Sequence, residues 1–115
     1  IARLQREAYP EIRPLRLGQT STAVREAAVA VAQGLGWEVL GTTELKDDSG
    51  ALVVEAVASS AIFGFKDDIA IRIAPLELGA LVDVRSASRV GLGDLGANAR
   101  RIAVFSAKLE AQFLK

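Results

Sequence analysis

The fold of this chain is decided by two stretches, DIAIRIA at residues 68–74 and ALVDVRSASR at residues 80–89. Both stretches alternate apolar and polar residues, which is the pattern of a strand with one buried face. Ile69, Ile71 and Ile73 share one face of the first stretch, and Val82 and Val84 share one face of the second. We therefore predict two neighbouring antiparallel strands connected by residues 75–79.

This pairing also restricts the register of the two strands. Facing residues of antiparallel neighbours point to the same side, so the isoleucines must oppose Val82 and Val84. One allowed register places Asp68 opposite Arg85, and the other places Arg72 opposite Asp83. Either register brings an acid and a base to facing positions.

The remaining elements follow outward from this pair. Residues 9–17 include two prolines and are expected to form at most an edge strand. Helical spacing of apolar residues predicts a helix after the hydroxyl residues 20–22, ending near Gly34 and Gly36, and a second helix over residues 95–114 with Asp94 as its N-cap. Residues 37–46 and 51–59 form a predicted hairpin around the turn DDSG at 47–50.

We therefore predict an α+β fold, with the order strand, helix, four strands, helix. The antiparallel sheet has four to five strands, and both helices cover one of its faces. Residues 1–8 are expected to be a flanking segment, and residues 9–115 a single domain.

Composition excludes several classes of function. The 14 basic and 14 acidic residues balance, which disfavours nucleic acid and anionic membrane surfaces as partners. The chain has no His or Cys, so the common general base, the common nucleophile and most zinc sites are excluded. The longest uncharged stretch, residues 27–37, is too short to span a membrane. Because the sequence begins at Ile1 and contains no Met, we expect membrane contact only through a segment that is not part of this chain.

Two motifs resemble catalytic or cofactor sites. Residues 91–96, GLGDLG, match the G-x-G-x-x-G spacing of a dinucleotide site, but no second parallel strand follows the helix, and Asp94 would repel a pyrophosphate. The adjacent acids Asp67 and Asp68 begin a strand, where their side chains point to opposite faces, a poor arrangement for shared catalysis. We predict no catalytic residue, no cofactor and no metal site.

The polar faces of the two central strands and the start of the second helix form the candidate site. These side chains are expected either to form ion pairs on a solvated face or to offer donors to an anionic group. The cluster is Asp68, Arg72, Asp83, Arg85, Ser86, Ser88, Arg89, Asn98 and Arg101. Phe63 and Phe65, in the connection before residue 68, are either a plug at the end of the sheet or a contact loop for a partner.

Several segments together resemble a known family. They are residues 9–15, 35–39, 63–73, 82–91 and 94–102, and the last three are the most specific in combination. The chain is similar over residues 9–114 to the bacterial and plant family catalogued as "domain of unknown function 1499". The resemblance carries no activity, substrate or cofactor, but implies a membrane-associated setting in the cell envelope. It also places Gly64, Asp67, Asp68, Arg72, Asp83, Arg85, Ser86, Ser88, Arg89, Asp94, Gly96, Asn98 and Arg101 on the family's motif positions, as one structural network or as a site.

Three hypotheses of function follow. The leading hypothesis is a non-enzymatic module, the soluble portion of a membrane-associated envelope protein, that binds a protein or a small anionic ligand. The alternative is a carrier of a lipid or another hydrophobe in a cavity between the second helix and the sheet. The least favoured is a hydrolase that uses carboxylates.

Overall fold

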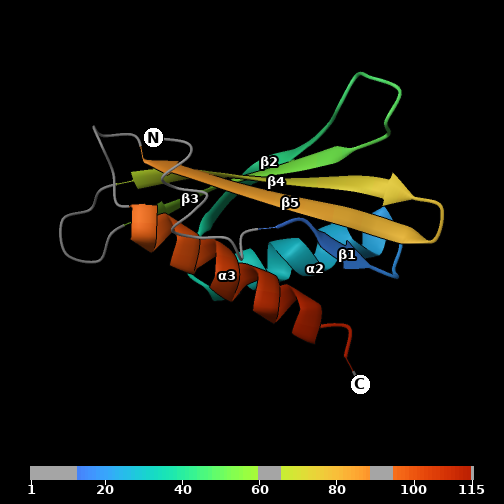
Figure 1. Ribbon diagram of the computed structural model, residues 1–115. Helices are drawn as coiled ribbons and strands as arrows, with labels where there is room; N and C mark the ends of the chain where they lie inside the picture. The colour runs from blue at the N-terminus through green and yellow to red at the C-terminus, as the bar shows by residue number, and fades with distance from the viewer. Residues whose placement is uncertain (1–12, 60–65, 89–94, 115) are drawn as a thin grey trace.

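The computed structural model describes residues 13–59, 66–88 and 95–114 and shows an α+β fold (Figure 1). The chain follows the predicted order of strand, helix, four strands and helix. In sequence, the elements are β1 (Leu15–Leu17), α2 (Ser21–Gly34), β2 (Glu38–Glu44), β3 (Leu52–Ser59), β4 (Lys66–Leu76), β5 (Gly79–Ser88) and α3 (Leu95–Ala111). The predicted fold class and element order are confirmed.

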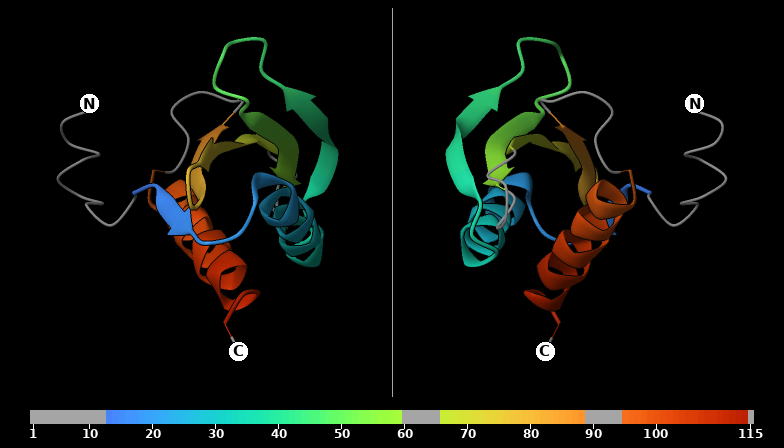
Figure 2. Two further views of the ribbon diagram at one scale, coloured as in Figure 1. Left: turned by 90° about the vertical axis from the view of Figure 1, so that its right-hand side faces the viewer. Right: turned by 90° about the vertical axis from the view of Figure 1, so that its left-hand side faces the viewer.

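The strands form one sheet in the order β1-β5-β4-β3-β2, and every neighbouring pair is antiparallel. Both helices lie on the same face of this sheet, which arches over them (Figure 2). Among the described residues, no helix covers the other face. The sheet therefore has a helix face, which contains the core, and an opposite face on which no described helix packs, which we call the open face.

The register between β4 and β5 is the second of the two that the sequence allowed. Arg72 lies opposite Asp83, and Ile71 lies opposite Val84. Ile69, Ile71 and Ile73 are buried against the helices, as their alternation predicted. No ion pair joins Arg72 to Asp83. The Asp83 Oδ2 atom lies 4.0 Å from Arg85 Nη2, on its own strand.

Strand β4 is longer than the predicted strand over residues 68–74. It begins at Lys66, and residues 75 and 76 continue it beyond Ala74. Proline lacks a backbone donor and is normally confined to edge positions. Here Pro75 faces Ala80 of β5, while β3 begins at Leu52, opposite Ile73. Pro75 thus has a paired strand on one side only. The turn shortens to Glu77 and Leu78.

Helix α2 begins and ends where hydroxyl and glycine residues predicted. The Thr20 Oγ1 atom accepts a hydrogen bond of 3.2 Å from the Ala23 amide, which satisfies one free donor at the helix start. Gly36 follows the helix with a φ of 85°, a conformation that glycine adopts without strain. Helix α2 is therefore positioned by its own local sequence.

The core joins both helices to the sheet. Phe105 of α3 is fully buried and stacks on Trp37, with ring centroids 5.3 Å apart. Leu109 is also fully buried on the same helix, four residues further along. These contacts fix α3 beside α2 on the helix face.

The two edges of the sheet differ. β1 is a three-residue edge strand that follows Pro14 and pairs with β5, as expected for a proline-containing segment. At the opposite edge, the register of β2 shifts between Val39 and Gly41, so that Leu40 is an extra residue in a β-bulge. The bulge leaves Leu40 56% exposed.

Candidate functional site

The residues of the predicted cluster are divided between the two faces of the sheet. Asp68, Arg72, Asp83 and Arg85 belong to the open face, because each alternates with a buried residue of the core. Ser86 and Ser88 face the helix side, and Asn98 and Arg101 come from α3. Arg89, Phe63 and Phe65 lie outside the described residues, as do Asp94 and the glycines at 91 and 93.

On the helix face, four polar side chains form a hydrogen-bonded network, which we call the corner network: Asp67, Ser86, Asn98 and Arg101. The Arg101 Nη1 atom lies 2.8 Å from Asp67 Oδ2, 2.7 Å from Asn98 Oδ1 and 3.1 Å from Ser86 Oγ. Ser86 Oγ also donates to Asn98 Oδ1 at 2.7 Å. The network ties the first turns of α3 to the adjacent ends of β4 and β5.

The corner network is largely withdrawn from solvent. Asn98 is buried, and the side chains of Asp67 and Arg101 are 15% and 20% exposed. A charged group placed there needs a partner of opposite charge, since its hydration is lost. Asp67 and Arg101 are each other's charged partner. The network therefore places three members of the predicted cluster, Ser86, Asn98 and Arg101, in contacts between α3 and the sheet.

Asp67 is the member of this network that the predicted cluster omitted. Its signal is present in the sequence, because Asp67 has the same strand parity as Ile69 and therefore shares its face. Alternation alone separates Asp67 from Asp68, which points to the open face. The two adjacent acids lie on opposite faces, as predicted.

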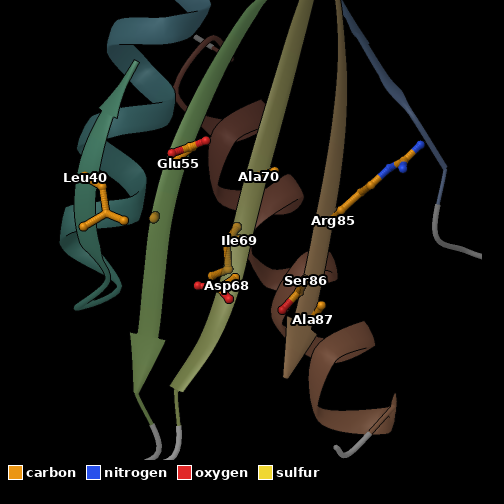
Figure 3. A pocket seen from close by; sticks show the side chains of 9 residues that line it. Leu40, Glu55, Asp68, Ile69, Ala70, Arg85, Ser86 and Ala87 are labelled. Carbon is orange, nitrogen blue, oxygen red and sulfur yellow. The ribbon is translucent and has the colours of Figure 1, made fainter. Parts of the chain in front are cut away.

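The open face carries a hollow of about 340 Å³, which we call the sheet hollow (Figure 3). Its residues come from four adjacent strands, β2 to β5. They are Leu40, Glu55, Asp68, Ala70, Arg85 and Ala87, together with Ala56, Ile69 and Ser86, which have the strand parity of the core. Ala70 and Ala87 have small side chains, which leave the hollow unfilled. Its charged lining residues are Glu55, Asp68 and Arg85.

Arg85 is a highly exposed charge at the sheet hollow. Its side chain is 84% exposed and extends outward from β5 (Figure 3). The Asp83 carboxylate lies 4.0 Å away, and the Asp83 side chain is 39% exposed. An ion pair this exposed to water is weak. Arg85 can therefore exchange this contact for one with another molecule at little cost.

The turn between β2 and β3 contains the carboxylate of Asp47. Asp47 Oδ1 accepts hydrogen bonds from the Ser49 hydroxyl and, at 3.0 Å, from the Ser49 amide. These two bonds lower the pKa of Asp47 below its ordinary value of 3.8, and the Arg72 charge lowers it further. The predicted turn at residues 47–50 is thus held by its own side chains.

A comparison with protein families places the chain. A family model described as "Protein of unknown function (DUF1499)" matches residues 1–109. The chain belongs to this family. The resemblance seen in the sequence is thereby confirmed, and the corner network lies within the matched part of the DUF1499 domain. No curated protein matches the chain.

Proposed function

We propose that this DUF1499 domain is a non-catalytic module that binds another protein through the open face of its sheet. The observation that carries the proposal is an exposed arginine, Arg85, beside an apolar hollow that Leu40 borders from a bulge. Arginine is enriched at protein interfaces because its planar group makes several hydrogen bonds while its stem packs against apolar surface. The open face offers both an exposed arginine, Arg85, and an apolar surface beside Leu40.

Charge favours a protein over a small anion at this surface. The sheet hollow is lined by the acids Glu55 and Asp68 and by one base, Arg85, so its lining is not cationic. Nearby, Arg72 and Asp83 add one charge of each sign. A surface of alternating signs complements another protein surface, on which charges of both signs also alternate.

The arrangement of acids supports a non-catalytic role. Asp67 is ion-paired with Arg101 on the helix face, whereas Asp68 and Asp83 are on the open face. Two carboxylates that act on one substrate must converge on it. These three do not converge. Among residues 13–59, 66–88 and 95–114, no group of three or more acids lies close enough together to hold a metal ion.

The carrier alternative finds no support between α3 and the sheet. Phe105 and Leu109 of α3 and Ile71 of β4 are fully buried there, and Trp37 stacks on Phe105. Close packing of this kind argues against a lipid chain at this point of the interface.

The envelope setting implied by the family remains a prediction. Neither α2 nor α3 combines the length and apolar character that crossing a bilayer requires. We propose that the domain acts as one part of a membrane-associated envelope protein, with its open face turned toward the partner.

The proposal is tested by affinity capture from an extract of the producing cells. The baits are the wild-type chain, a Leu40→Asp/Arg85→Glu variant, and a Glu110→Lys control that reverses an exposed charge on α3. We expect a protein captured by the wild type and the control, and lost by the double variant. Equal capture by all three folded baits, checked by circular dichroism, would refute a role for the open face.

A further inference from the structure

A second surface, on the opposite side of the sheet from the open face, lies between the two helices. α2 and α3 lie side by side on the helix face, and two hollows follow their junction. One of about 260 Å³ is lined by Leu35, Trp37, Arg100, Arg101 and Val104. The next, of about 340 Å³, is lined by Ala30, Val31, Gly34, Lys108, Ala111 and Gln112. We call the two together the helix groove.

The helix groove is long and apolar. From Arg100 to Ala111 it follows α3 for roughly 17 Å, at about 1.5 Å per residue. Val104 is 45% exposed, and Ala30, Gly34 and Ala111 are exposed small residues that allow a close approach. The two hollows lie at or below the lower end of the range of about 300–1,000 Å³ typical of ligand pockets. An elongated occupant fits this surface better than a compact small molecule.

The charges of the helix groove have a single sign. Every charged residue that lines it is basic: Arg100, Arg101 and Lys108. Asp67 neutralises Arg101, whereas Arg100 and Lys108 form no ion pair with any described residue. The sheet hollow, by contrast, contains Glu55 and Asp68, and a third hollow, at the turn between β4 and β5, contains Glu77 with Arg16. The helix groove is thus the surface, among these three, that complements an acidic partner.

The spacing of the two unpaired bases defines the partner further. Arg100 and Lys108 are eight positions apart on α3, which is about 12 Å along the helix. Two acids seven or eight residues apart on a second helix span the same distance. A helix also presents apolar residues at i, i+3, i+4 and i+7, the stripe that enters a groove between helices.

We propose that the helix groove binds an acidic amphipathic helix of another protein. The apolar stripe of that helix rests on Leu35, Val104 and the small residues of the groove. Its acids, about two turns apart, pair with Arg100 and Lys108. This contact is independent of the proposed open-face interaction, because the two surfaces lie on opposite sides of the sheet.

The test is a selection from a displayed library of amphipathic helices, using the whole chain as bait. The charged positions that flank the apolar stripe are varied freely between Glu, Lys and Gln. We expect the selected helices to carry acids seven or eight residues apart. Their affinity, measured by fluorescence anisotropy, should fall about tenfold or more in an Arg100→Glu/Lys108→Glu variant and stay unchanged in Arg16→Glu, a matched charge reversal on β1.

Three results would overturn the proposal. The selection could yield no binder, or binders without paired acids, or binders insensitive to the Arg100→Glu/Lys108→Glu variant. Self-association of the chain that this variant abolishes, measured by sedimentation, would assign the groove to a second copy instead. Binding to phosphatidylglycerol vesicles that is lost in the same variant, without helix binding, would assign the groove to a lipid surface.

Discussion

At Gly79, the fold leaves no space for a side chain. A Cβ atom there would lie 2.0 Å from the Leu17 carbonyl oxygen, and the φ of 148° strains any other residue. We expect Gly79→Ala to displace β1 and lower the free energy of unfolding by about 2 kcal/mol or more. Urea denaturation measures the loss. Gly18→Ala is the matched control, since its Cβ meets no atom within 4 Å; equal stability of the two variants would contradict the packing of β1.

The pKa of Asp47 is a measure of the hydrogen bonds that hold the turn before β3. Hydrogen bonds from Ser49 lower the pKa of Asp47 below 3.8, so the folded state favours the charged form. Its contribution to stability is present above the unfolded pKa and is lost as the pH falls through the lower, folded value. Carbon-detected NMR titration should show a pKa under 3.8 that rises in Ser49→Ala. An Asp47 pKa that is the same in both proteins would show that Ser49 does not shift it.

The corner network joins helix α3 to β4 and β5. Replacing Arg101 with Leu leaves Asp67 as a mostly buried charge without its partner. We expect a loss of about 2 kcal/mol in the free energy of unfolding. Arg100→Leu, at the exposed neighbouring position, should change stability by less than about 0.5 kcal/mol. A similar small effect of both variants in urea denaturation would mean that the network adds no stability.

The contact between Phe105 and Trp37 holds α3 against the segment that follows α2. Phe105→Ala removes a fully buried ring and should cost about 3–5 kcal/mol. Trp37 is the single tryptophan of the chain, so its fluorescence reports directly on this contact. We expect emission shifted to longer wavelength and a lower urea midpoint. Unchanged emission would indicate that the ring stack is absent in solution.

The fold could be predicted from local sequence patterns wherever a pattern is compatible with only one structure. The alternation of the isoleucines restricted the register to two choices, and the structure has Arg72 opposite Asp83. The bulge at Leu40 was not predictable, because an extra residue in an edge strand leaves no periodic mark. Pro75 was misread as a strand end because the length of β3, a non-local feature, decides whether its missing donor matters.

The candidate site was predictable only in part, for the same reason. Strand parity separates Ser86 from Arg85, and it would have joined Asp67 to Ser86. It cannot show that Arg101 reaches across from α3 to bind Asp67, because that contact depends on how the helix packs on the sheet. The helix groove likewise arises only when α2 and α3 lie side by side.

For the molecule as a whole, the central claim is that the open face binds a protein partner. The most direct measurement is the dissociation constant of the captured partner, determined by calorimetry for the wild type and for the Leu40→Asp/Arg85→Glu variant. We predict a constant at least about tenfold larger for the variant, because it replaces an apolar contact with a charge and reverses the exposed base of the sheet hollow. Equal constants for the two folded proteins would contradict the account.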